Sequence, residues 1–305
     1  DNYNVAVGFV AGQAITTGVQ NVLIGSLAGD ALTDADFNIA VGTSALSTDT
    51  LGSQAVAIGH DALFNQNFTT ATTNYNVAVG SQAGNDVTTG FHNVLIGALA
   101  GDALTDSDYN TALGHQALTS DTLGARSTAI GRHALYAQNF TTATDAYNVA
   151  VGFNAGQQMT TGIENTIVGA RAGDALTDAD FNVVVGQGAL SADTLGSKSV
   201  AIGAGTLNVQ NFTTATDTFN TAVGHVAGGS ITSGTLNTFV GGLAGDALTT
   251  GDSNVVLGYN ALSADTKGAR SIAIGRDALK VQNFTTSTNT FNVAVGDRAG
   301  EVVTT

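Results

Sequence analysis

The chain has 305 residues and a formal net charge of −15, from 24 acidic and 9 basic residues. This acidic balance argues against nucleic acid or an anionic membrane surface as a partner, because both require a basic surface. The sequence has no cysteine, which excludes disulfides and thiolate metal sites, and no apolar run is long enough to insert into a membrane as a helix.

A five-residue phrase, first seen as Asn-Val-Ala-Val-Gly at residues 4–8, recurs along the whole chain. The first five copies end at Gly8, Gly25, Gly42, Gly59 and Gly80. The steps are 17, 17, 17 and 21 residues, so a 72-residue super-repeat occurs four times and begins a fifth. A fixed short period is typical of stacked-repeat proteins. We expect residues 1–305 to form a single β-solenoid with one coil per unit. We also expect the chain to be a segment of a longer fibre, because it stops in the middle of a unit.

We number each coil from the residue that opens the phrase, and we distinguish four coil types by their order in the super-repeat. Positions 2 and 4 are Val, Ile, Leu or Thr in all 17 coils, and position 3 is always apolar. Alternate residues of a strand point to opposite faces, so this strand is apolar on both and is expected to be covered on both. We expect one face to line the coil. Further copies of the chain are expected to meet through position 3, so Ala40→Asp with Ala112→Asp would dissociate the assembly.

Three further columns have simple interpretations. Position 5 is glycine in every coil, which indicates a corner with positive φ or no room for a Cβ. Position 8 is alanine in 16 of 17 coils, with Thr206 the exception, and this indicates close packing. Position 1 is Asn in the first three coil types; Asn tolerates a left-handed corner, and its side chain can hydrogen-bond along the stack. The remaining residues are small and polar and predict turns or a second short strand, not helix.

The repeat resembles known families. Ser-Val-Ala-Ile-Gly at 199–203 resembles the head repeat of YadA-type trimeric autotransporter adhesins, although the coils of that family are shorter. Asn-Thr-Ala-Leu-Gly-His-Gln-Ala-Leu at 110–118 is similar to the Asn-Thr-Ala-Val-Gly-x-x-Ala-Leu repeats of phage tail fibres and related bacterial surface proteins. The resemblance covers the whole chain. It implies a parallel β-roll or β-helix that forms an intertwined or side-by-side homotrimer. It also implies a location outside the cell, on a virion tail fibre or a bacterial surface, and a role in attachment.

The fourth coil type contains four extra residues and the sequence Gln-Asn-Phe-Thr-Thr, first at 66–70. Insertions in a solenoid map to one face, often a binding face. The candidate binding residues are Asn67, Phe68, Asn139, Phe140, Asn211, Phe212, Asn283 and Phe284. The phenylalanines are expected to be buried rather than exposed as receptor contacts. Asn-Phe-Thr is also an N-glycosylation acceptor sequence, and this alternative stays open.

Acidic runs recur in the second coil type as Gly-Asp-Ala-Leu-Thr-Asp. Clustered carboxylates on a turn are candidates for calcium, which takes six to eight oxygen ligands. The candidate ligands are Asp30, Asp34, Asp36, Asp102, Asp106, Asp108, Asp174, Asp178 and Asp180. The spacing matches no known calcium loop, so a solvated turn with Asx hydrogen bonds is the alternative, and no other cofactor is indicated.

The five histidines fall at non-equivalent positions, and no pair has metal-ligand spacing in the sequence. Basic residues such as Arg126 and Lys198 gather in the fourth coil type and are expected to pair with acidic loops. Together with the resemblance, the repeat predicts a non-enzymatic structural and adhesive fibre segment. Its expected partners are copies of itself and a host surface glycan or protein. The alternative is a carbohydrate-processing β-helix similar to a phage tailspike, which would need paired carboxylates at non-repeating positions.

Overall fold

A computed structural model describes residues 2–305. Within this range the chain forms 25 β-strands and no helix, so it contains no helix that could cross a membrane. Strands pair in parallel from one coil to the next. The predicted all-β class and the β-solenoid of about 17-residue coils are confirmed.

The chain divides into two compact units, of which the first ends at Asn148 and the second is Val149–Thr305. Each unit contains one main sheet, with one three-residue strand per coil. The strands of the first unit are β1 (Val5–Val7), β2 (Val22–Ile24), β3 (Ile39–Val41), β5 (Val56–Ile58), β7 (Val77–Val79), β8 (Val94–Ile96), β9 (Thr111–Leu113) and β11 (Thr128–Ile130). The strands of the second unit are β13 (Val149–Val151), β14 (Thr166–Val168), β15 (Val183–Val185), β17 (Val200–Ile202), β19 (Thr221–Val223), β20 (Thr238–Val240), β21 (Val255–Leu257), β23 (Ile272–Ile274) and β25 (Val293–Val295).

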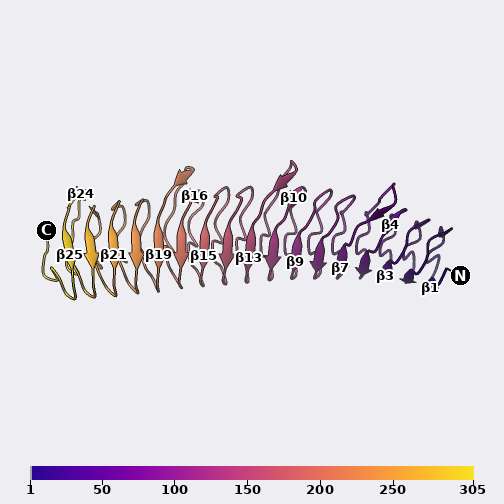
Figure 1. Cartoon of the computed structure of the whole chain (residues 1–305), viewed down its shortest axis with the longest axis horizontal. Helices are drawn as coiled ribbons and strands as arrows, with labels where there is room; N and C mark the ends of the chain where they lie inside the picture. Colours follow the sequence, from indigo (N-terminus) through magenta and orange to yellow (C-terminus); the bar gives the residue numbers. More distant parts are fainter. Residues whose placement is uncertain (1) are drawn as a thin grey trace. The chain divides into compact units, whose positions relative to one another are not determined.

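Equal positions of successive coils stack in register. Ala6 lies opposite Leu23, and Leu23 opposite Ala40, with the same pattern in the second unit. Within each unit the arrows of the main sheet lie side by side (Figure 1). Residues that occupy the same position in successive coils therefore stack on one another, so each recurring position of the repeat forms a column along the coils.

Position 3 faces the interior of the coil. Ala40 and Ala112 have no exposed surface, and Leu23 is equally buried. Positions 2 and 4 face outward, where Ile24, for example, is 40% exposed. The prediction that copies meet through position 3 is therefore wrong about the face. Both faces of the strand are apolar, so the alternation did not reveal which one pointed inward.

The glycine at position 5 forms the predicted corner. Its φ lies between 126° and 143° throughout, a region that residues with a side chain rarely adopt. A Cβ on Gly114 would also lie 2.6 Å from the carbonyl oxygen of Gly131 in the next coil. The alanine at position 8 packs just after this corner and is fully buried in most coils, for example at Ala28.

The asparagines at position 1 form the predicted ladder. The backbone N–H of Asn21 donates to Oδ1 of Asn4 (2.8 Å), and Nδ2 of Asn21 donates to the carbonyl of Ala35 (2.7 Å). The expectation that Asn itself is left-handed is wrong. The left-handed residue is the one before it, as at Gln20 (φ 57°) and Phe37 (φ 60°). The asparagine thus caps the corner through its side chain instead of forming it.

The four coil types differ in how they fill the core. In the first two types, position 12 is apolar, as at Val87 and Leu104, and position 9 is glycine. In the third and fourth types, position 9 is leucine, as at Leu118, and position 12 is Asp121 or Gln138. All of these position 12 side chains are fully buried. The super-repeat therefore alternates a pair of apolar coils with a pair that contains buried polar groups.

The four extra residues form a raised loop in each fourth-type coil. In Figure 1 the loops at β4, β10 and β16 rise beyond the other turns of their units. Each loop ends in a two-residue strand that pairs in parallel with a two-residue strand of the preceding coil. These pairs are β4 (Gly52–Ser53) with β6 (Thr72–Thr73), β10 (Gly124–Ala125) with β12 (Thr144–Asp145), β16 (Gly196–Ser197) with β18 (Thr216–Asp217), and β22 (Gly268–Ala269) with β24 (Thr288–Asn289).

Candidate functional site

A buried carboxylate holds each raised loop to the body of the coils. Oδ1 of Asp49 accepts hydrogen bonds from the backbone N–H groups of Gly52 (3.0 Å) and Phe68 (3.0 Å). Its Oδ2 accepts a bond from Nε2 of Gln66 (2.6 Å). The same arrangement recurs at Asp121, Asp193 and Asp265, and all four aspartates are fully buried. We call each group of Asp, Gln and Phe N–H a loop anchor.

The loop anchor continues into the next coil. In the first copy, Oε1 of Gln66 accepts a hydrogen bond from Nδ2 of Asn76 (2.8 Å). In the second copy, Oε1 of Gln138 accepts a bond from Nδ2 of Asn148 in the next coil (3.0 Å), and Nε2 of Gln138 also donates to Oγ of Ser127 in its own coil (3.0 Å). The buried polar atoms are thus paired with one another, which is the condition under which a polar group is tolerated in a core.

The hydrogen-bonding partners of these aspartates are a glutamine amide and backbone N–H groups. Burial raises the pKa of Asp49 and of Asp121, and the bonds from the glutamine side chain and the backbone N–H groups offset part of this effect. Because every partner is a donor, the ionised carboxylate satisfies the anchor best, while burial opposes ionisation. The anchor is therefore a balance between desolvation and three hydrogen bonds.

The predicted binding residues of the inserted loops lie in two environments. Phe68, Phe140 and Phe212 are only 6–8% exposed, which confirms the expected burial, and Phe284 is half-buried. Asn139, Asn211 and Asn283 are exposed, and Asn67 is half-buried. Oδ1 of each asparagine accepts a bond from a threonine hydroxyl of the preceding coil, for example from Thr50 to Asn67 (3.2 Å). The threonines that follow at the loop tips, such as Thr69 and Thr70, are exposed.

The predicted calcium ligands do not come together. Asp34 accepts a bond from the Thr17 hydroxyl (2.6 Å), and Asp36 accepts one from the backbone N–H of Val19 (2.8 Å), both in the preceding coil. The equivalent residues Asp106, Asp108, Asp178 and Asp180 have matching contacts, and Asp102 accepts a bond from Thr119. Asp30 and Asp174 are half-buried, and burial raises their pKa. Residues 2–305 contain no group of three acidic, histidine or cysteine side chains placed to hold a metal ion.

An exposed stack of rings lies beside the second raised loop. The His92 ring stacks between those of Tyr75 and Tyr109, with centroids 5.3 and 5.1 Å apart. The guanidinium of Arg126 lies 5.0 Å from the Tyr109 ring and 5.8 Å from that of Tyr147. These five side chains all precede position 1 of a coil, and we call them the aromatic ridge. Tyr75, Tyr109 and Tyr147 of the ridge are 45–52% exposed.

In two of the raised loops, an acidic residue forms an ion pair with the basic residue that precedes position 1 of the same fourth-type coil. Arg126 bonds Asp145 (2.8 Å), and Lys198 bonds Asp217 (2.6 Å). The expected pairing of basic residues with acidic loops is confirmed for these two. In the first loop the equivalent residues are Gln54 and Thr73, so the four loops are not braced equally.

The sequence did not predict two groupings. His115 and His133 lie on neighbouring coils with ring centroids 6.1 Å apart, although they are 18 residues apart in the chain. The loop anchor was also missed. Its sequence signal is Asp-Thr-x-Gly, at 49–52 and in the three later copies, because a Cβ on Gly52 would lie 2.1 Å from Oδ2 of Asp49.

The outward face of each main sheet is a regular surface. It consists of positions 2 and 4, which hold no charged residue in any coil. Ile58, Leu113, Ile202 and Val240 of position 4 are 36–42% exposed.

Comparison of the chain with models of known protein families and with curated proteins found no match.

Proposed function

We propose that this protein is a non-enzymatic structural and adhesive fibre segment, used outside the cell on a virion tail fibre or a bacterial surface. In this proposal the stacked coils form the shaft, copies of the chain associate along it as a homotrimer, and the raised loops contact the host surface. The observation that carries the proposal is the uncharged outward face of the main sheet in a chain with a net charge of −15.

Charge supports self-association through this face. Two copies of a strongly acidic chain repel each other, and the repulsion is weakest where neither copy presents a charge. The outward face offers Val, Ile, Leu and Thr at every coil, with Val7, Ile24 and Ile58 among the exposed residues. A second copy would remove these side chains from water, at roughly 25 cal/mol per Å² of apolar surface.

The raised loops support the attachment role. They are the regular departures from the coil, and their exposed tips carry two threonines in each copy, such as Thr213 and Thr214. Because the loop anchor fixes the base of each loop from within the core, the tip is presented in one position without being part of the shaft. The buried phenylalanines belong to this base, so we assign contact with a host glycan or protein to the tips.

Sedimentation equilibrium tests the self-association. The wild-type chain is expected to sediment as a trimer of the 30.5 kDa chain. Ile58→Lys with Leu113→Lys places two charges on the outward face and is expected to give monomers with an unchanged circular dichroism spectrum. Thr89→Lys adds a charge at an exposed residue outside the main sheet and is the control. A monomeric wild type, or an unaffected double variant, would contradict the proposal.

A further inference from the structure

The side chains that precede position 1 form a column along the coils of each unit, and the aromatic ridge is part of this column in the first unit. The backbone holds its members in register. The N–H of Gln54 donates to the carbonyl of Asp36 in the preceding coil (2.9 Å), and the N–H of Arg126 donates to the carbonyl of Asp108 (3.0 Å). Members of the column from different copies of the super-repeat can therefore be compared directly.

In three of the four copies, the third-type coil ends in a cation that lies against an aromatic ring of the column. The guanidinium of Arg126 lies 5.0 and 5.8 Å from two tyrosine rings of the aromatic ridge. The equivalent cations of the two later copies lie 5.3 Å (Lys198 and Phe219) and 5.7 Å (Arg270 and Phe291) from a ring. A cation in this position is attracted by the electrons of the ring face. The later copies thus show which kind of group this place holds.

The first copy has the aromatic rings without the cation. Phe37 and Tyr75 are 48% and 51% exposed, and the residue between them in the column is Gln54. The backbone there is the same as at Arg126, with φ of 63° and 62°. A glutamine side chain ends at its amide, before the guanidinium carbon of an arginine is reached. We call Phe37 and Tyr75 the open ring pair.

The open ring pair has the spacing and the free ring face that a guanidinium requires. Its two residues are two coils apart, which corresponds to about 10 Å, and the tyrosines on either side of Arg126 are also two coils apart. His92 stacks on one face of Tyr75 from the following coil (5.3 Å between centroids), so the other face is turned toward the coil of Gln54. The amide oxygen of Gln54 is an acceptor that can bond a guanidinium N–H.

The sequence around the open ring pair is acidic and contains no basic residue. The first 125 residues contain 11 aspartates and no lysine or arginine. Asp34 is exposed, and the half-buried Asp36 directly precedes Phe37. A cation from outside the chain is attracted to such a region, and no lysine or arginine of these 125 residues competes for the rings.

We propose that the open ring pair binds an arginine side chain of a partner protein that presents a basic segment. The guanidinium lies between the two rings, as that of Arg126 does between its tyrosines, and donates to the amide oxygen of Gln54. A second copy of this chain is the less favourable source of the arginine, because two chains with a net charge of −15 repel each other. This inference does not depend on the proposed fibre function.

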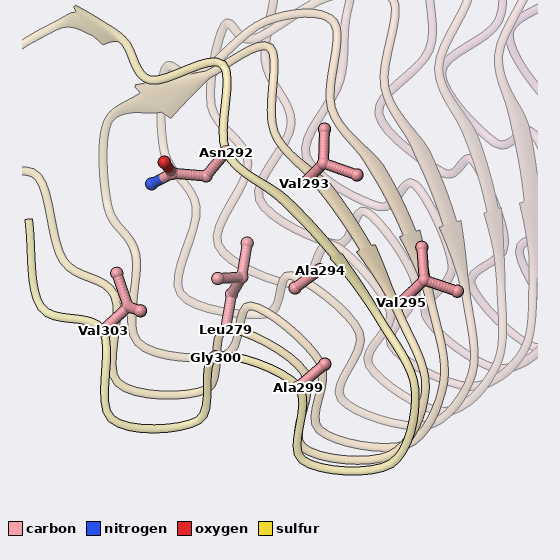
Figure 2. Close-up of a pocket in the computed structure, with 8 residues that line it drawn as sticks. All are labelled: Leu279, Asn292, Val293, Ala294, Val295, Ala299, Gly300 and Val303. Carbon is pink, nitrogen blue, oxygen red and sulfur yellow. The ribbon is translucent and has the colours of Figure 1, made fainter.

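The open ring pair lies beside the outward face of the main sheet, since only position 1 separates the column from position 2. Figure 2 shows this order in the coil that begins at Asn292, where Asn292 and Ala294 point into the coil and Val293 and Val295 point to the other side. The test therefore follows the oligomeric state together with binding.

The test uses the full chain and a fluorescein-labelled peptide, Gly-Arg-Gly-Ser-Arg-Gly-Ser-Arg. The comparison peptide has citrulline, the uncharged analogue of arginine, in place of each arginine. Fluorescence anisotropy is expected to show saturable binding of the arginine peptide and at least about tenfold weaker binding of the citrulline peptide. Gln54→Arg supplies the chain's own guanidinium, as in the second copy, and is expected to weaken binding of the arginine peptide at least about tenfold.

Two further variants separate the rings from general charge. Tyr75→Leu removes an aromatic face at a position where Leu236 stands in a later coil with φ of 59°, and is expected to weaken binding about fivefold. Gln82→Arg is the matched control. It adds the same charge at an exposed residue with φ of 57°, where Arg171 is the equivalent residue in the second unit, and should bind the arginine peptide as the wild type does.

Equal binding of the two peptides, wild-type binding by Gln54→Arg or Tyr75→Leu, or an equal loss in Gln54→Arg and Gln82→Arg would overturn the proposal. Sedimentation equilibrium of the same variants identifies the competing occupant. Gln54→Arg is expected to leave the oligomeric state of the chain unchanged, and its dissociation by this substitution but not by Gln82→Arg would show that a second copy supplies the arginine instead.

Discussion

The first two coil types and the last two solve the same packing problem with different side chains. Position 12 is apolar in one pair, as at Leu104, and is Asp121 or Gln138 in the other, yet all three residues are fully buried. The main-sheet strands, the glycine corner and the alanine column are the same in both pairs. The difference teaches that the apolar pair only extends the stack of coils, whereas the polar pair also fixes a loop that leaves it.

The largest expected loss of stability comes from substituting the glycine at position 5, which all four coil types share. Gly186→Val would place a Cβ 2.5 Å from the Gly203 carbonyl of the next coil at a φ of 139°. We expect the free energy of unfolding to fall by more than about 3 kcal/mol, measured by urea denaturation. Gly188→Asn is the control, because φ there is 62°, nothing lies within 4 Å of the added Cβ, and Asn260 occupies the equivalent position. A similar loss in both variants would refute the steric corner.

The next largest effect differs between the two pairs of coil types, because their side chains at position 12 differ. Leu104→Ala leaves a cavity in an apolar core and is expected to cost about 2–5 kcal/mol of global stability. Asp121→Ala removes the acceptor of three N–H groups, but the loop can move out and bond water, so we expect a global loss of only about 1–2 kcal/mol. Thermal and urea unfolding of both variants measure which substitution lowers the free energy of unfolding more. Equal losses would mean that the anchor is part of the shaft.

The pH dependence of stability provides a further test of the buried Asp121 carboxyl group in the polar pair. Burial raises the folded-state pKa of the Asp121 carboxyl above its ordinary value. A carboxyl group with a raised folded-state pKa contributes stability below its unfolded pKa and loses that contribution as the pH rises through the folded pKa. The free energy of unfolding of the wild type, measured relative to Asp121→Ala, is therefore expected to fall as the pH rises above about 4. A difference that grows with pH would contradict this sign.

The smallest effect concerns the bracing of one loop. Arg126→Gln gives the second loop the residue that the first loop has at Gln54, and it removes the ion pair with Asp145 and the contacts with two tyrosine rings. Exposed pairs of this kind contribute little, so we expect a loss below about 1 kcal/mol. Urea denaturation measures it, with Lys198→Gln as the parallel case in the third loop. A loss as large as that of Leu104→Ala would show that the ridge holds the shaft together.

Much of this architecture was predictable because some positions of the coil accept only one residue type. The glycine at position 5 and the alanine at position 8 have no alternatives at a crowded corner, and a column of identical residues shows this in a single sequence. The direction of the strand was not predictable. Ala40 and its neighbours Ile39 and Val41 are all apolar, so the pattern fits either face inward.

The loop anchor escaped prediction for a different reason. Asp49 lies in the polar stretch Ser-Thr-Asp-Thr, where a carboxylate is expected to face water, and its partners Gln66 and Phe68 belong to the next coil. Only the stacking places the Gln66 amide and the Phe68 N–H at its oxygens. The burial of Phe68 could be predicted from its residue type, but the donor that its backbone supplies could not.

Hydrogen exchange with mass spectrometry tests the central claim, that each fourth coil carries a loop that a buried aspartate fixes to the stacked coils. In the wild type, the amides of Phe140 and Gly124 are expected to be protected to a degree comparable with those of β9 and β11. In Asp121→Ala, exchange should rise in the loop at 139–146 and stay unchanged in those strands. A loop that exchanges freely in the wild type, or a variant whose strands lose protection together with the loop, would contradict the account.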